Sequence, residues 1–183
     1  MTENKMPYLV RKINKRKNMD LLNEISDFNT LSADLPTGEF RTTNGTLSTW
    51  IIDSLEDINN AVLAIAVTSS KLSKMDFIVI DTKILQENDL QYQKTYAGRE
   101  IAIPDLQDTH YDIVDLSLGK LANCANVYKI VYDNDDAQGK YIRRFLEGEI
   151  KDMIKTAYND GRICLEQADN NMKTELLKLL KIA

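Results

Sequence analysis

Short apolar runs and alternating residues dominate the first hundred positions, and they predict strands there. Residues 8–13 alternate between two faces and predict an edge strand. Residues 46–52 predict a second strand, and the unbroken apolar run 77–80 is typical of a strand that is covered on both faces. Between these two strands, apolar residues from 55 to 65 recur every three or four positions, which predicts a helix ending near Thr68. Strand, helix and strand together indicate one βαβ unit.

The pair Asn44-Gly45 predicts a two-residue hairpin turn between residues 40–43 and 46–52. A type I′ turn requires positive φ at both central residues, and Asn and Gly adopt positive φ more readily than other residues. Trp50, the only tryptophan, lies in the second strand of this hairpin. We therefore expect Trp50 to be a buried core residue.

Helical spacing dominates the chain after Pro104. It predicts helices over residues 106–128, 141–157 and 165–182. The sequence thus predicts an α+β fold, with a small mixed sheet of about four strands in residues 1–103 and a helical part in residues 104–183 that packs on it as one compact domain. The first helix would carry an acidic stripe of undefined role, formed by Asp105, Asp108, Asp112 and Asp115.

The formal net charge of −5 argues against a dedicated nucleic-acid-binding protein, because neutralising phosphates requires clustered Lys and Arg. One basic segment is the exception, and it includes Arg11, Lys12, Lys15, Arg16 and Lys17. This N-terminal arm could contact nucleic acid within a complex, or its lysines could simply protect an edge strand.

The longest uninterrupted apolar stretch, residues 61–67, is much shorter than the roughly 20 residues that span a bilayer. We therefore expect a soluble, cytoplasmic protein without membrane contact. Cys124 and Cys164 show neither the spacing of a zinc site nor that of a disulfide framework. Both cysteines are expected to be small core residues.

Arg41, Ser48 and Thr49 resemble the arginine and Ser-Thr elements of ADP-ribosyltransferases, which hold NAD between two strands. The resemblance implies a glutamate element on a later strand. The spaced pair Glu147 and Glu149 instead falls within a predicted helix. A structural hairpin with a packed tryptophan is therefore the favoured interpretation of this segment.

Asp53 and Asp81 follow two successive predicted strands, so they could share the carboxyl edge of the sheet and hold a divalent cation. Each is also followed by a predicted helix, and N-capping explains both without chemistry. His110, the only histidine, lies on an apolar stripe, which favours a hydrogen-bonded structural role. The sequence therefore indicates no metal and no cofactor, and a nucleotide- or NAD-handling enzyme remains an alternative built on Arg41, Ser48, Thr49, Asp53 and Asp81.

Three segments carry a resemblance to a set of short, uncharacterised bacterial proteins: the opening PYLVRKINKRK, the segment NGTLSTW with the helix after it, and the closing NDGRICLE. The resemblance covers most of the chain. Proteins of this set occur beside mobile elements and multi-gene phage-defence loci. The resemblance therefore implies a cellular context, without a mechanism.

These patterns favour a non-enzymatic interaction or adaptor subunit of a multi-protein bacterial complex. The last predicted helix carries leucines on more than one side, so a small domain would not cover all of them: Leu176, Leu177, Leu179 and Leu180. An exposed apolar patch of this kind predicts a protein interface. The partner could be a co-encoded ATPase or nuclease, or a second copy of the chain in a homo-oligomer.

Overall fold

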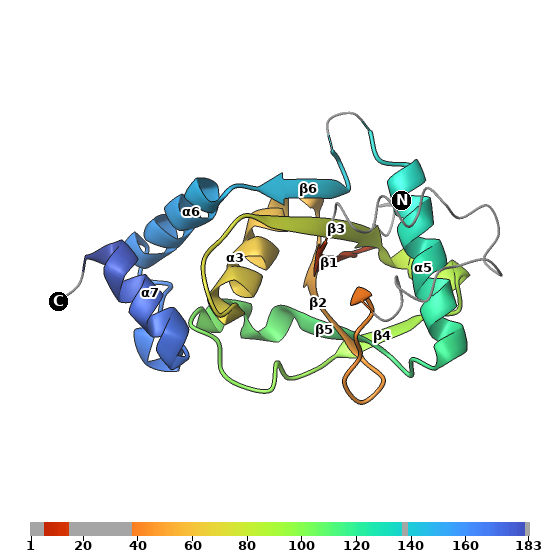
Figure 1. The fold of residues 1–183 in the computed structure, drawn as a ribbon, viewed down its shortest axis with the longest axis horizontal. Coiled ribbons are helices and arrows are strands. Elements are labelled where there is room, and N and C mark those ends of the chain that lie inside the picture. The colour runs from red at the N-terminus through yellow and green to blue at the C-terminus, as the bar shows by residue number, and fades with distance from the viewer. Residues whose placement is uncertain (1–5, 15–37, 137–138, 182–183) are drawn as a thin grey trace, which may run out of the picture.

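The protein is described here by a computed structural model, which covers residues 6–14, 38–136 and 139–181. Six strands form one sheet in the order β4-β5-β2-β1-β3-β6, and each neighbouring pair is antiparallel (Figure 1). The strands are β1 (Tyr8–Ile13), β2 (Leu47–Ile52), β3 (Met75–Asp81), β4 (Gln91–Lys94), β5 (His110–Val114) and β6 (Ile142–Phe145). The α+β fold class is confirmed, although the sheet is larger than the sequence predicts.

The predicted strand–helix–strand unit is present in a split form. β2 and β3 both run antiparallel to β1, so they run parallel to each other with β1 between them. α3 (Ile58–Thr68) connects β2 to β3, and it ends at Thr68 as predicted. The inserted β1 is why every hydrogen-bonded pair is antiparallel, where the sequence predicts a mixed sheet.

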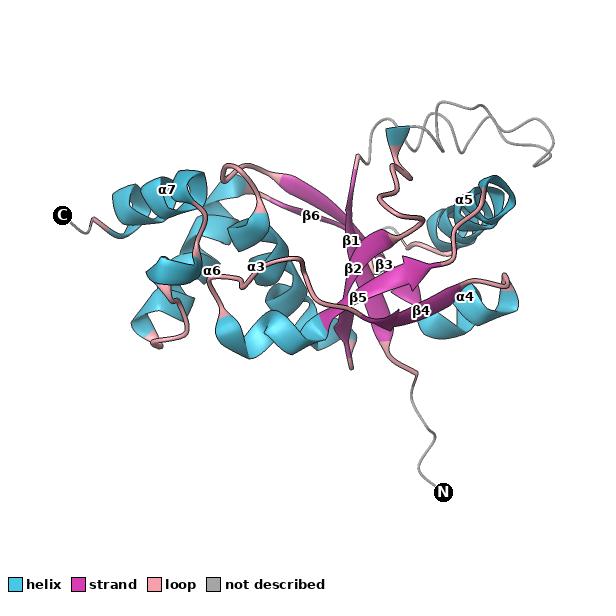
Figure 2. Cartoon of the chain, turned by 90° about the horizontal axis from the view of Figure 1, so that it is seen from below, coloured by secondary structure: helices cyan, strands magenta, loops and turns pink. Residues whose placement is uncertain are grey.

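Helices cover both faces of the sheet (Figure 2). α3, α6 (Glu147–Asn159) and α7 (Asn170–Leu180) lie on one face, whereas α4 (Thr82–Glu87) and α5 (Leu118–Asp133) lie on the other. Within the described residues, three short 3-10 turns connect these elements: η2 (Leu55–Asp57), η3 (Pro104–Thr109) and η4 (Leu165–Gln167). No helix within the described ranges is long and apolar enough to cross a membrane.

Alternation along the central strands divides the core between the two faces. Val10, Trp50 and Phe77 pack beneath α3, α6 and α7. Leu9 and Ile78, their neighbours in sequence, pack on the opposite face beneath α4 and α5. Because successive strand residues point to opposite faces, the continuous run at 77–80 fits a strand that is buried on both sides, as the sequence predicts.

The predicted turn and the predicted burial of the tryptophan are both confirmed. Asn44 and Gly45 have φ values of 54° and 71°, and Thr43 and Thr46 exchange two backbone hydrogen bonds across them. Trp50 is only 5% exposed. The hairpin itself is limited to this one bridge, because both edges of β2 are occupied by β1 and β5.

Two short strands replace parts of the predicted helices. β5 occupies the segment 110–114 that helical spacing assigns to a helix over 106–128, and β6 begins the segment that spacing assigns to a helix over 141–157. In β5 the chain also alternates, with Tyr111 half-buried and Ile113 buried on one face and His110 and Asp112 on the other. Both segments could follow either helical or strand spacing. Pairing with the free edges of β2 and β3 stabilises the strand in each case.

Candidate functional site

The residues of the ADP-ribosyltransferase resemblance are not brought together. Ser48 is exposed, whereas Thr49 is buried on the opposite face and donates a hydrogen bond to the Tyr111 carbonyl oxygen at 2.8 Å. Arg41 is exposed in the segment before the hairpin turn. Glu147 and Glu149 begin α6 beyond β6, which lies three strand spacings from β2, about 14 Å at the usual separation. These groups therefore do not face one pocket.

Asp53 and Asp81 lie at the same end of the sheet but are separated by β1. Two strand spacings separate their backbones by about 10 Å. Asp81 Oδ1 instead accepts a hydrogen bond from the Lys83 amide at 2.8 Å and caps α4. Among the described residues, no three His, Cys, Asp or Glu side chains are grouped so that they could hold a metal ion.

His110 is held in the core by its neighbours. Its Nδ1 lies 2.9 Å from Thr95 Oγ1, and its ring packs edge-on against Trp50 with centroids 5.0 Å apart. Its Nε2 lies 3.8 Å from Asp112 Oδ1, which is beyond hydrogen-bonding distance. The surroundings of His110 are those of a structural residue, as its place on an apolar stripe predicts.

The predicted acidic stripe is not a stripe, because its members lie on three different kinds of backbone. Asp105 and Asp108 belong to η3, Asp112 is buried in β5, and Asp115 adopts positive φ in the turn before α5. Asp105 is paired with Arg162 at 2.7 Å. The stripe depended on the helix over 106–128, and it disappears with that helix.

The C-terminal leucines are largely covered by the protein itself. Leu176 is fully buried in α7, and Leu179 and Leu180 pack against the core beneath the same face of the sheet. Leu177 is half-buried. The excess apolar surface that predicts an interface at these residues is therefore much smaller than the sequence suggests.

The basic N-terminal segment divides into two parts. The Arg11 guanidinium turns into the fold and donates hydrogen bonds to the carbonyl oxygens of Ser48 at 2.8 Å and Glu39 at 3.1 Å, so this side chain is not free to contact nucleic acid. Lys12 is exposed. The remaining members, Lys15, Arg16 and Lys17, lie outside the described residues.

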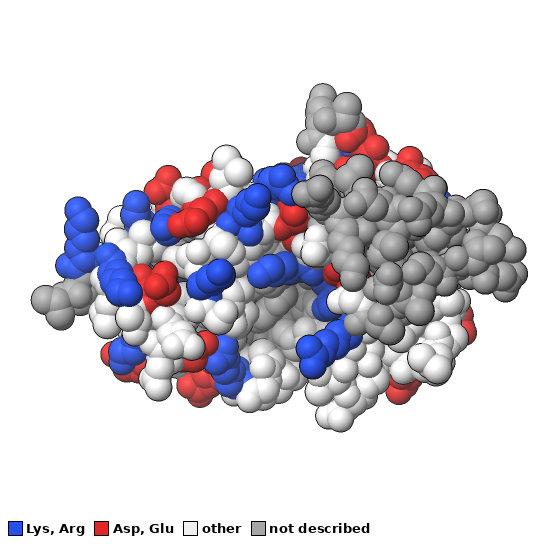
Figure 3. Space-filling view, viewed as in Figure 1, with Lys and Arg blue, Asp and Glu red and all other residues white. Residues whose placement is uncertain are grey.

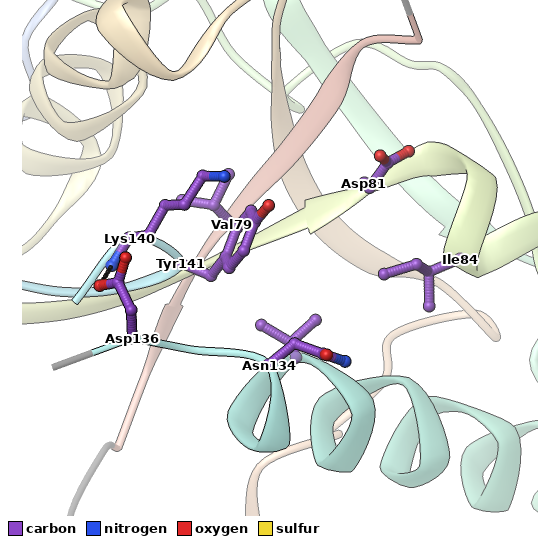
Figure 4. Close-up of a pocket in the computed structure, with 8 residues that line it drawn as sticks. Val79, Asp81, Ile84, Asn134, Asp136, Lys140 and Tyr141 are labelled. Carbon is purple, nitrogen blue, oxygen red and sulfur yellow. Dashed lines mark hydrogen bonds between the residues drawn. The ribbon is translucent and has the colours of Figure 1, made fainter. Parts of the chain in front are cut away.

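A pocket of about 360 Å³ opens at the edge of the sheet between β3, α4, α5 and the start of β6 (Figure 4). We call it the edge pocket. In Figure 4, Asp81 and Ile84 lie across it from Lys140 and Tyr141, with Asn134 between the two sides. Its lining is Val79, Asp81, Ile84, Val131, Asn134, Asp136, Lys140 and Tyr141.

The pocket exists because β6 covers only part of β3. β6 pairs with Met75 to Ile78, and beyond them only the Tyr141 carbonyl oxygen accepts a hydrogen bond from Val79 N–H, at 2.8 Å. The chain before Tyr141 folds away from the sheet, and Asp135 Oδ1 fixes this bend by accepting from the amides of Tyr141 and Ile142 at 2.6 and 3.2 Å. The far half of β3 is thereby left open to the pocket.

A glycine is required at this bend. Gly139 has a φ of 70°, and its amide donates to the Asp136 carbonyl oxygen at 2.9 Å. A Cβ at this position would lie 2.9 Å from the Ile142 carbonyl oxygen, a closer approach than backbone atoms tolerate. Both the left-handed conformation and the lack of space therefore exclude a side chain.

Two ionisable groups at or beside the pocket rim have raised pKa values. A hydrogen bond with Tyr141 raises the pKa of Lys140, whose Nζ lies 4.9 Å from the centre of the Tyr141 ring. Burial, assisted by the charge of Asp81, raises the pKa of the neighbouring Tyr8. Both pKa values are thus shifted further above pH 7, so Lys140 stays protonated and Tyr8 stays uncharged at that pH. Neither group is a competent base or nucleophile there.

The edge pocket is the feature that sequence reasoning missed. The run Asp133 to Asp136 reads as a solvated turn, and nothing local reveals that Asp135 anchors the start of β6. The available signal was Gly139 close to an acidic cluster, which marks a tight bend.

Compared with family models, with curated proteins and with solved structures, the chain matches none of them.

Proposed function

We propose that the protein is a binding subunit of a multi-protein bacterial complex and that the edge pocket receives an apolar side chain from a protein partner. The resemblance to short proteins beside phage-defence loci supports this context and favours a co-encoded ATPase or nuclease as the partner. The pocket supports the mode of binding. A non-enzymatic role fits the carboxylates of the pocket, because Asp81 caps α4 and Asp136 accepts a hydrogen bond from the Lys140 amide.

One observation carries the proposal: the edge pocket presents the half-buried Ile84 side chain, while Asp81 and Asp136 at its rim already serve the fold. Ile84 is half-buried and Val131 is almost fully buried in the lining, whereas the Val79 side chain belongs to the core on the opposite face of the sheet. Asp81 caps α4, and Asp136 Oδ1 accepts from the Lys140 amide at 3.2 Å. A well-packed apolar anchor in a pocket with a polar rim is the usual centre of a protein interface.

Co-purification of the tagged full-length chain with the products of its neighbouring genes tests this proposal. We expect Ile84→Lys to abolish capture of the partner, because the new ammonium group would have to be desolvated inside the filled pocket. Leu118→Lys is the matched control, since it places the same group on a side chain that is 87% exposed and outside the pocket lining. Capture that survives Ile84→Lys but fails in Leu118→Lys would place the interface near Leu118, at the start of α5 and away from the pocket, and would overturn the pocket assignment.

A further inference from the structure

One end of the central strands gathers unpaired positive charge. At this end β1 finishes and β3 begins, because Ile13 pairs with Asp76. Lys12 lies one residue before the end of β1, and Lys71 and Lys74 lie in the segment that enters β3. Arg41 belongs to the same end, since Glu39, two residues before it, accepts a hydrogen bond from Arg11 of β1. We call Lys12, Arg41, Lys71 and Lys74 the basic end of the sheet.

The four side chains are free to engage a ligand. All four are exposed, and none forms an ion pair within the part of the chain that the structure describes. The nearby carboxylate of Asp76 is already engaged, because Arg144 donates a hydrogen bond to each of its oxygens, at 2.7 and 3.0 Å. Its charge is therefore neutralised without using any of the four.

The basic end is also hollowed. Pairing between β1 and β2 stops at Val10 and Trp50, although β1 continues to Ile13. The strands part beyond that point, and the Arg11 guanidinium reaches across to the Ser48 carbonyl oxygen. Figure 3 shows Lys and Arg side chains around a hollow near the middle of this face. Positive charge around a concavity concentrates the field on whatever enters it.

The opposite end of the same strands carries several carboxylates. Asp53 and Glu56 follow β2 there, and Asp81 ends β3. Lys140 lies at that end too, because its charge acts on Tyr8 together with the charges of Asp81 and Glu56, so both signs are present there. The exposed cations of the basic end would attract a polyanion approaching in solution.

We infer that the basic end of the sheet binds the phosphate backbone of a nucleic acid. The inference rests on the proposed function as a binding subunit and adds a second class of partner to it. Three of the four cations are lysines, which bind phosphates as point charges. They come from separate segments around a hollow, which suits the regularly spaced charges of a nucleic-acid strand. Backbone contacts of this kind are independent of base sequence.

The test is fluorescence anisotropy of the full-length protein with labelled 30-nucleotide single-stranded DNA, duplex DNA and single-stranded RNA. The informative variant is Lys12→Gln/Lys71→Gln/Lys74→Gln. Its matched control, Lys151→Gln/Lys155→Gln/Lys178→Gln, changes the net charge by the same amount on α6 and α7. All six positions are solvent-accessible side chains, and thermal melting of each variant verifies that the fold is retained.

We expect the wild-type chain to bind at least one of the three probes, the basic-end variant to bind at least tenfold more weakly, and the control to stay within about twofold. The slope of log affinity against log salt should fall by roughly 2 to 3, in line with three lost phosphate contacts. Equal weakening in both variants, or no binding of any probe at low salt, would overturn the inference. So would binding of polyglutamate, but of no nucleic acid, with the same dependence on the three lysines. Partner capture through the edge pocket is measured separately, so either proposal can fail alone.

Discussion

The Arg11 guanidinium lies 2.8 Å from the Ser48 carbonyl oxygen at the point where β1 and β2 part. A second bond from the same side chain reaches the Glu39 carbonyl oxygen at 3.1 Å. Arg11 therefore bridges two segments that backbone pairing no longer joins. The hollow at the basic end keeps its shape through this side chain.

Replacement of Arg11 by methionine should lower the free energy of unfolding by about 1.5 to 3 kcal/mol, because hydrogen bonds made by a charged group are lost between β1 and β2. Denaturant titration measures the loss. Lys12→Met, at the exposed neighbouring position, is the control and should stay within about 0.5 kcal/mol of the wild type. Equal midpoints for Arg11→Met and wild type would show that the strands need no bridge.

Trp50→Ala should cost about 3 to 5 kcal/mol of stability, because the ring is 5% exposed and packs edge-on against His110. The native protein should also show blue-shifted tryptophan emission that moves to the red on unfolding. This residue is the only tryptophan, so the signal is unambiguous. Emission typical of a water-exposed ring in the native state would contradict its placement in the core.

Gly139→Ala should destabilise the protein by about 1 kcal/mol or more, because the residue combines a φ of 70° with no room for a Cβ. Gly148→Ala provides a contrast, since Gly148 lies within α6 with nothing near its Cβ position. That change should stabilise by up to about 1 kcal/mol. Thermal melting of the two variants compares them, and a neutral Gly139→Ala would refute the tight bend.

Cys124 should resist thiol reagents in the native protein, while Cys164 reacts. Burial raises the pKa of the Cys124 thiol to about 12, whereas Cys164 is only half-buried. The unfolded thiol ionises near pH 8.5, so above that pH the unfolded chain binds fewer protons and stability falls as pH rises toward 12. Cys124→Ala should weaken this dependence. Two equally fast-reacting thiols in the native state would contradict the burial.

The central part of the fold could be predicted from the sequence because its signals are local. Asn44-Gly45 determines its own turn, and the apolar runs around α3 and β3 are long enough to define their elements. β5 and β6 could not be predicted in the same way. Each is four or five residues long, and its helix-like spacing is overridden by pairing with a strand that is distant in sequence.

The candidate sites depend still more on distant contacts. The edge pocket needs Asp135 to hold the amide of Tyr141, and the basic end needs Lys12 to lie beside a loop that begins some sixty positions later. Conversely, the C-terminal leucines look unpartnered in the sequence because α6 and the sheet that cover Leu176 are not visible from its neighbours. Charge and apolar patterns in the sequence identify single candidate residues. Which of these residues lie together is determined by the folded chain.

Size-exclusion chromatography with light scattering, on the full-length chain co-expressed with its neighbouring genes, tests the central claim most directly. We expect one stable complex whose mass exceeds that of the chain by a co-encoded partner, and we expect Ile84→Lys to return the chain to its own mass while Leu118→Lys leaves the complex intact. A chain that elutes alone under all conditions, and that turns over NAD in a manner lost in Arg41→Ala with the fold retained, would contradict the account and establish an enzyme instead.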